Sequence, residues 1–255
     1  MKAIYPQKQA RQLTTYIKDS FQKEGYTEAL VAVSGGVDSA TSLMLTARAL
    51  GPTHVHAVLL PYGRLNTEET KDAKMLIASL KIPQKNVYLV DIQPMVDAVF
   101  AYDKHMDEGR RGNVMARMRM VVLYDLSKKM GALVVGTENK TEHLLGYYTR
   151  FGDEASDLEP LRQLYKTQVY ELARYLKLPK KILTKPPTAG LWQGQTDEGE
   201  FGFTYKEVDE VLSLYFDEHV SKEAILGKGY DKKTIERMWW WINKGNFKDR
   251  MPLIT

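Results

Sequence analysis

Short apolar segments that alternate with helical patterns limit the folds open to this chain more than any other feature. Residues 29–33 are apolar at every position, and a helical pattern follows them as far as Gly51. Similar, mainly apolar strands are predicted at 54–60, 87–92 and 133–135. Because apolar strands need cover on both faces, the sequence predicts an α/β fold, a doubly wound parallel sheet with helices on both faces and further C-terminal helices.

The remaining helices are predicted from apolar side chains spaced three and four residues apart. They are expected at residues 6–24, 67–80, up to 100, 114–129, 167–176, 205–218 and 231–244. Two stretches lack a clear period, the polar segment 137–164 and the segment 190–202. Long irregular connections in a compact domain are usually functional, so we expect segment 137–164 to carry binding residues. Segment 190–202 is expected to be mobile, and whether it closes as a lid is left open.

Composition excludes several classes of protein. The chain has no cysteine, which rules out disulfides, thiolate metal sites and cysteine nucleophiles. A balance of 36 Lys and Arg against 32 Asp and Glu is too even to indicate a nucleic-acid or membrane partner. No signal peptide and no apolar run of membrane-spanning length is found. We therefore expect a cytoplasmic protein with one domain over residues 1–255.

The connection between the first strand and its helix has the composition of a phosphate-binding turn. Glycines let the backbone approach a phosphate, the N–H groups at the start of the helix point at it, and serine hydroxyls can donate hydrogen bonds. In an open α/β sheet this position, beyond the carboxyl end of a strand, is where ligands bind. The residues concerned are Ser34, Gly35, Gly36, Val37, Asp38 and Ser39.

The loop differs from the two common nucleotide-binding fingerprints, since neither G-x-x-x-x-G-K-[ST] nor G-x-G-x-x-G occurs. Asp38 is the informative departure, because a carboxylate in a phosphate site repels the ligand unless a divalent cation lies between them. The loop therefore predicts Mg²⁺ together with a nucleotide. The alternative is a tight Gly-Gly turn in which Asp38 and Ser39 only favour the start of a helix.

These residues carry a family resemblance that extends over nearly the whole chain. The string SGGVDS resembles the signature of the N-type ATP pyrophosphatases, which activate a carboxylate or carbonyl oxygen by adenylation. Further strings resemble the ammonia-dependent NAD synthetases of that class. They are GTENKTE (136–142), GYYTRFGD (146–153), Asp157, Pro160-Leu161, LYK (164–166), KPPTA (185–189) and QTDE (195–198).

The resemblance implies a Rossmann-like fold of the adenine nucleotide alpha hydrolase type and a two-step reaction. The nicotinate carboxylate of deamido-NAD attacks the α-phosphorus of ATP and releases pyrophosphate. Ammonia then displaces AMP from the acyl adenylate to give NAD. The first step needs cationic groups on a polyphosphate, and the second needs unprotonated ammonia and the exclusion of water.

The resemblance also implies roles for individual residues. Asp38 and Glu142 would be the Mg²⁺ ligands, and Asp153 would lie beside the nicotinate, where it could orient ammonia or take its proton. Asp38, Asp153 and Lys166 are the expected catalytic set. The expected ATP-binding residues are Ser34, Gly35, Gly36, Val37, Asp38, Ser39, Arg117, Thr137, Lys166 and Thr188.

The expected dinucleotide-binding residues rest on the same resemblance. In this family the dinucleotide lies at a dimer interface, so a homodimer is expected and some of these residues would serve the neighbouring subunit. Gly190 and Phe247 depart from the family pattern, which usually has a carboxylate and a histidine there. The expected residues for deamido-NAD are Asn113, Lys140, Tyr147, Asp153, Asp157, Asp197, Glu198 and Lys248.

Two other functions stay open on the sequence alone. One is another ATP pyrophosphatase-type enzyme that amidates a different carboxylate, and the other is an ATP-binding regulator without chemistry. A regulator would be expected to lack the set Glu142, Asp153 and Lys166. The nitrogen donor is expected to be free ammonia, since a glutaminase normally needs a cysteine and a domain of its own. A separate subunit that supplies ammonia is not excluded.

Overall fold

A parallel sheet at the centre of the molecule confirms the predicted fold class. The computed structural model describes residues 1 and 3–250. In the described chain the strands follow the order β3-β2-β1-β4, and all three pairings are parallel. The carboxyl ends of β2, β1 and β4 therefore lie side by side at one edge, which is where the connecting loops carry the site. The strands are β1 (Glu28–Ala32), β2 (Val55–Leu59), β3 (Val87–Leu89) and β4 (Ala132–Val135).

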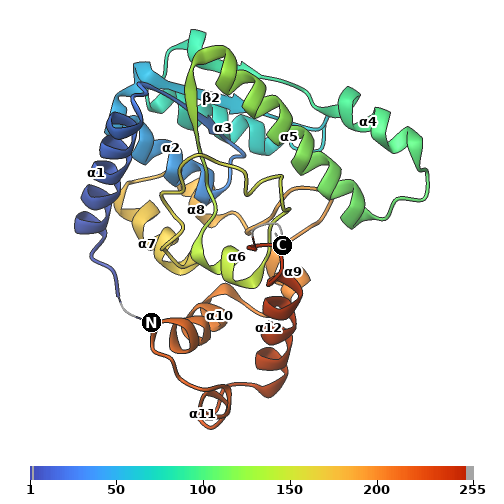
Figure 1. Ribbon diagram of the computed structural model, residues 1–255. Coiled ribbons are helices and arrows are strands. Elements are labelled where there is room, and N and C mark those ends of the chain that lie inside the picture. Colours follow the sequence, from blue (N-terminus) through green and yellow to red (C-terminus); the bar gives the residue numbers. More distant parts are fainter. Residues whose placement is uncertain (2, 251–255) are drawn as a thin grey trace, which may run out of the picture.

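Helices cover both faces of the sheet (Figure 1). Alternate side chains of β1 enter separate cores, with Ala29 and Val31 on one face and Leu30 on the other. The first core is closed by α1 (Pro6–Glu24), α2 (Val37–Leu50), α3 (Thr67–Ser79), α7 (Lys166–Tyr175) and α8 (Lys180–Thr184). The second core is closed by α4 (Gln93–Tyr102) and α5 (Glu108–Met130). Single 3₁₀ turns, Pro52–His54 and Gln84–Asn86, lead into β2 and β3.

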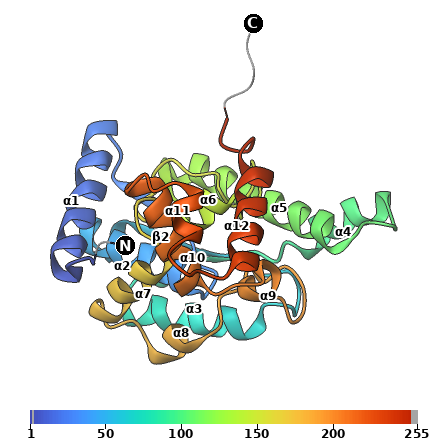
Figure 2. The same ribbon diagram turned by 90° about the horizontal axis from the view of Figure 1, so that it is seen from below.

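A third apolar core joins the C-terminal helices to the short helix α6 (Lys140–Leu145). Leu145 and Phe201 are fully buried there, with Tyr165 almost so. In Figure 2, which views the molecule from the end where these helices pack, α10 and α12 lie across the centre while α1 and α4 lie at opposite sides. The helices are α9 (Asp197–Phe201), α10 (Tyr205–Leu212) with a π-helical turn at Ser213–Asp217, α11 (Lys222–Leu226) and α12 (Lys232–Gly245).

The predicted elements agree with the structure except at short helices and element ends. The segment 137–164, expected to be irregular, contains α6, which begins because the Asn139 side chain accepts the backbone N–H of Glu142. Similarly, α5 starts six residues earlier than predicted, since Asp107 caps it. The helices α8, α9 and α11 were not predicted because five residues are too few to show a period.

The described part of the chain has no helix long and apolar enough to cross a membrane. Two histidines near the start of β2, His54 at the end of the 3₁₀ turn and His56 in the strand, share one carboxylate partner. His54 and His56 each contact one carboxylate oxygen of Glu28, at 2.8 and 2.9 Å. Among the described residues, no cluster of three or more histidine or acidic side chains could hold a metal ion by itself.

Candidate active site

A cavity of about 270 Å³ opens at the carboxyl edge of the sheet, between the loops that follow β1, β2 and β4 and the helix α9. It is lined by the phosphate loop on one side and by the segment that leads into α9 on the other. The residues that line the cavity come from distant parts of the sequence. The lining therefore shows which of the predicted site residues lie close together in the fold. Those in its wall are Ser34, Gly36, Val37, Asp38, Ser39, Thr137, Glu142, Tyr147, Asp153, Lys166, Thr188 and Asp197.

The phosphate loop is held in shape by its two serines. The hydroxyl oxygens of Ser34 and Ser39 lie 2.9 Å apart, and the Ser34 N–H donates to the Ser39 hydroxyl at 3.2 Å. The Ser39 hydroxyl also lies 3.2 Å from the Gly36 carbonyl, to which it can donate. The shape of the loop is therefore set by its own hydrogen bonds. Its last three residues form the first turn of α2, which begins at Val37. The free N–H groups of this first helical turn provide a positive end for a phosphate.

Gly35 shows why the loop needs a glycine. Its φ of +85° lies in the left-handed region, and a Cβ built there would lie 2.4 Å from the carbonyl oxygen of Glu69. A side chain would therefore have both backbone strain and a collision with the backbone of α3. The close approach of α3 to the loop also places Glu69 in the cavity wall.

Gly35→Ala is expected to lower the free energy of unfolding by about 2–5 kcal/mol, the sum of left-handed strain and overpacking. Gly25→Ala is the matched control, because Gly25 has a φ of +73° with nothing within 4 Å of its Cβ position. It should cost only the strain, about 1–2 kcal/mol. Urea unfolding measures both variants. Equal losses of stability would show that the contact with α3 does not constrain the loop.

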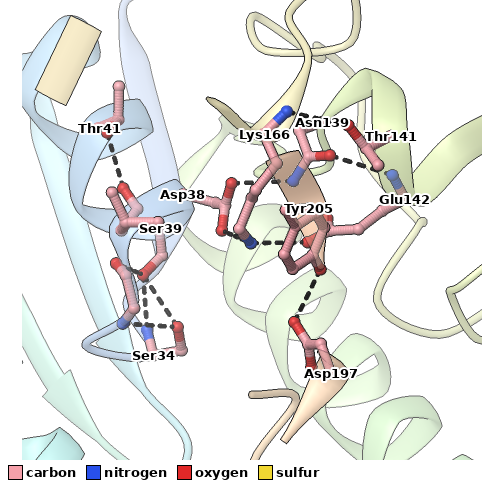
Figure 3. Close-up of polar contacts among 12 residues, drawn as sticks. Ser34, Asp38, Ser39, Thr41, Asn139, Thr141, Glu142, Lys166, Asp197 and Tyr205 are labelled. Atoms are coloured by element: carbon pink, nitrogen blue, oxygen red, sulfur yellow. Dashed lines mark hydrogen bonds and ion pairs between the residues drawn. The ribbon is translucent and has the colours of Figure 1, made fainter. Parts of the chain in front are cut away.

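Two carboxylates from different elements converge on one cation in the cavity wall (Figure 3). The Lys166 ammonium lies 2.6 Å from Asp38 Oδ2 and 2.9 Å from Glu142 Oε1. Lys166 is 3% exposed although it starts α7, so this charge is surrounded by protein. Asp38 comes from α2, which follows β1, and Glu142 comes from α6, which follows β4. Lys166 starts α7, after the long connection, so three separate segments supply one charged cluster.

Neighbouring side chains fix the positions of these three charges. Asn139 donates from Nδ2 to Asp38 Oδ1 at 2.9 Å, while its Oδ1 caps the helix that carries Glu142. The Asp209 carboxylate, fully buried on α10, accepts hydrogen bonds from Thr141 and from the backbone N–H of Thr167. Since Thr141 and Thr167 flank the cluster residues in α6 and α7, Asp209 holds these two helix starts together.

The charges shift one another's protonation. Burial disfavours the ammonium, but attraction by Asp38 and Glu142 is stronger and holds the pKa of Lys166 well above its ordinary value. Burial also raises the pKa of Glu142. Attraction by Lys166 lowers this pKa and repulsion by Asp38 raises it, and the net result is a raised pKa. Asp38 and Glu142, two carboxylates that both contact Lys166, have the donor chemistry that Mg²⁺ binds.

An aromatic and acidic wall closes the cavity opposite the phosphate loop. The Tyr147 hydroxyl lies 3.2 Å from both Asp197 Oδ1 and Glu200 Oε1, and the Tyr205 hydroxyl donates to Asp197 Oδ2 at 2.8 Å. Tyr147 packs edge-on against Phe201, so its ring orientation is set by α9. Both oxygens of Asp197 therefore have tyrosine partners, and this residue supports Tyr147 from behind.

Asp153 lies in the cavity wall with its Oδ1 accepting the backbone N–H of Thr149 at 2.8 Å. The side chain keeps access to solvent in the cavity, but the surrounding protein disfavours its charged form and raises the pKa of Asp153, against hydrogen bonds that favour that form. The raised pKa makes the Asp153 carboxylate a stronger base than an ordinary aspartate, and the residue lines the cavity.

The other predicted dinucleotide residues lie outside the cavity wall. Lys140 pairs with Asp217 at 2.5 Å, and Lys248 donates to the carbonyls of Gly146 and Tyr148. The remaining ones have structural contacts, since Asn113 accepts from Thr149, Asp157 accepts from the Val134 N–H, and Glu198 accepts from the Tyr205 N–H. Arg117, predicted to bind ATP, also lies outside the cavity wall and donates to the Arg150 carbonyl. Of the two departures, Gly190 has a φ of +62° and Phe247 is 58% exposed.

Arg119 belongs to a basic cluster in the sequence, with Arg110, Arg111 and Arg117, that suits a phosphate-rich ligand, and it lines the cavity. Sequence reasoning missed two residues that support the site. Asn139 could have been found, because an Asn three residues before a Glu is a helix start signal. Tyr205, which contacts Asp197, carried no local signal. Its position depends on packing between elements that are far apart in the sequence.

Comparison with known proteins identifies the family. A family model described as NAD synthase matches residues 9–252. The chain belongs to the NAD synthase family. A relative from Fusobacterium nucleatum named NH(3)-dependent NAD(+) synthetase is 43% identical over 244 residues, which are 96% of this chain and 93% of the relative.

Two solved structures of the same fold cover almost all of the chain. An NMN synthetase from Francisella tularensis has a TM-score of 0.88 and 35% identity, with 99% of each chain covered. An NH3-dependent NAD synthetase from Campylobacter jejuni has a TM-score of 0.83 and 30% identity, with 99% of this chain and 100% of the other covered. The NAD synthase fold of this chain is thus supported by sequence and by structure.

Proposed function

We propose that this chain is an ammonia-dependent NAD synthetase. It amidates deamido-NAD with ammonia through an acyl adenylate and releases AMP and pyrophosphate. The observation that carries the proposal is the convergence of Asp38, Lys166 and Glu142 beside a preformed phosphate loop. The activity named for the relatives supports the same reaction. An ATP-binding regulator would need none of this charged cluster.

For adenylation, the phosphate loop and Lys166 bind the polyphosphate of ATP. The backbone N–H groups at the start of α2 and the hydroxyls of Ser34 and Ser39 face the phosphates, and Thr137 and Thr188 lie in the same cavity wall. Asp38 and Glu142 would hold Mg²⁺, which would supply positive charge for the leaving pyrophosphate. The Lys166 ammonium, which bridges these two carboxylates, would then bind the phosphates.

For amide formation, Asp153 orients the incoming ammonia and takes a proton as the C–N bond forms. Its raised pKa suits this role, because a base is effective when its pKa approaches the working pH. Tyr147, held by Asp197 and Glu200, offers the face of an aromatic ring to the nicotinate. The nitrogen donor is free ammonia, and residues 1–255 act as a single catalytic domain that pairs with a second copy of the chain.

Asp153→Asn is expected to slow amide formation by about 10²-fold and to affect pyrophosphate release much less. The amide oxygen still accepts the Thr149 N–H, so the local structure is retained while the base is lost. Single-turnover measurement of pyrophosphate and NAD separates the two steps. Glu154→Gln, a change in the next carboxylate, which lies outside the cavity wall, is the control. An equal loss of both steps in the Asp153 variant would argue against its role with ammonia.

A second candidate substrate is the mononucleotide that lacks the adenylate half, since the structure with a TM-score of 0.88 is named NMN synthetase. Its reaction would be the same amidation on nicotinate mononucleotide. Purified protein given MgATP, ammonium and either substrate distinguishes the two by kcat/KM. The proposal expects deamido-NAD to be preferred, and a preference for the mononucleotide would change the substrate while leaving the chemistry intact.

A further inference from the structure

Arg119, on α5, is a cation in the cavity wall whose charge has no acidic partner among the ion pairs of the described residues. Its Nε donates to the Leu60 carbonyl at 3.0 Å, and its Nη2 donates to Asn66 Oδ1 at 3.3 Å. A guanidinium has five N–H donors, and these two hydrogen bonds to neutral acceptors use only two of them.

The surroundings of Arg119 differ from those of the other buried cation in the cavity. Lys166 is neutralised by two carboxylates, whereas Arg119 is attracted by Asp153 without forming an ion pair with it. Burial lowers the pKa of Arg119 to about 10, which leaves the group charged at neutral pH. An uncompensated charge in a protein cavity is costly, and an anion that enters the cavity removes that cost.

The contacts of Arg119 also fix where such an anion lies. Leu60 directly follows β2, and the phosphate loop directly follows β1, which is the neighbouring strand in the sheet. The guanidinium is thus anchored one strand away from the phosphate loop at the same edge. The side of the cavity near Arg119 has apolar walls at Val58, Leu60 and Leu123, which suit an adenosine better than a polyphosphate.

We propose that Arg119 binds the α-phosphate of ATP and keeps hold of it in the acyl adenylate. This assignment rests on the proposed function. The β- and γ-phosphates leave as pyrophosphate and belong to the loop and Lys166, while the α-phosphate stays attached to the adenosine. Attack by the nicotinate carboxylate brings two anions together, and a guanidinium on the α-phosphate lowers that repulsion. Asn66 and the Leu60 carbonyl are positioning groups, because they aim the planar fork.

The test compares two ligands that differ only by the phosphate. Titration calorimetry gives the affinities of AMP and adenosine for the full chain and for Arg119→Met. Removal of the guanidinium is expected to weaken the affinity for AMP at least about tenfold and to change the affinity for adenosine less than about twofold. Arg119→Lys retains the charge without the planar guanidinium. Its affinity for AMP is expected to lie between those of the unmodified chain and of Arg119→Met. Arg110→Met, on an exposed arginine of the same helix that pairs with Asp103, should leave both affinities unchanged.

Two outcomes would overturn the proposal. One is an unchanged affinity for AMP in Arg119→Met, and the other is an equal loss of affinity for AMP and adenosine, which would indicate a structural role alone. Thermal unfolding of each variant identifies any that fail to fold, and the lysine variant then provides the comparison. Because the titrations need no turnover, they stay interpretable even if the protein does not make NAD. A failure of this inference is therefore distinguishable from a failure of the proposed function.

Discussion

Lys166→Met is expected to reduce the rate of pyrophosphate release by about 10³-fold, within the range seen when one group that stabilises developing charge is removed from an enzyme site. The ammonium is 3% exposed and contacts Asp38 and Glu142, so no solvent cation can replace it in the same geometry. Methionine keeps most of the volume and removes the charge. The rate is measured with saturating deamido-NAD, ATP and magnesium.

The control for this variant is Lys206→Met, in which an exposed lysine beside Tyr205 undergoes the same substitution. It should release pyrophosphate at the normal rate. Because Lys166→Met leaves two carboxylates facing each other, the thermal unfolding of both variants is compared to exclude loss of the fold. A folded Lys166→Met protein with normal pyrophosphate release would show that the polyphosphate is bound elsewhere.

Asp38→Asn and Glu142→Gln are each expected to lower adenylation by at least about 10²-fold, because neutral amides are poor ligands for Mg²⁺. Asn at position 38 can still accept from Asn139, so the packing between the phosphate loop and α6 is retained. Pyrophosphate release is measured over a series of magnesium concentrations. The loss should be partly recovered at high magnesium, which marks weakened metal binding rather than a disrupted loop.

Glu171→Gln, an exposed carboxylate on α7, is the matched control and should follow the unmodified protein at every magnesium concentration. The metal assignment would be wrong if either active-site variant released pyrophosphate at the normal rate. It would also be wrong if both lost activity to the same extent whatever the magnesium concentration.

The phosphate loop is the part of the site that sequence predicts best, because its geometry is local. Ser34 and Ser39 lie five residues apart and their hydroxyls meet within one turn. The parallel sheet follows from apolar strands between helices, and this also places Glu142 near Asp38, since β1 and β4 are neighbours. The roles of Glu142 and Lys166 were implied by the family resemblance, and the pairing of β1 with β4 explains why Glu142 lies near Asp38.

What sequence could not predict depends on packing between distant elements. Asp197, a predicted dinucleotide residue, lies in the cavity wall, but its contacts with Tyr147 and Tyr205, which come from different segments, could not be predicted. Lys140 likewise pairs with Asp217, 77 residues away. The uncompensated charge of Arg119 arises only once α5 packs against the loop after β2. Such features depend on tertiary contacts that neither periodicity nor a short string encodes.

The central claim is tested most directly by giving the purified protein deamido-NAD, MgATP and either ammonium or glutamine, and following NAD, AMP and pyrophosphate together. The account predicts NAD with ammonium, no NAD with glutamine, and equal amounts of NAD, AMP and pyrophosphate. Formation of ADP and phosphate in place of AMP and pyrophosphate, or no amide with ammonium while ATP still binds, would contradict it.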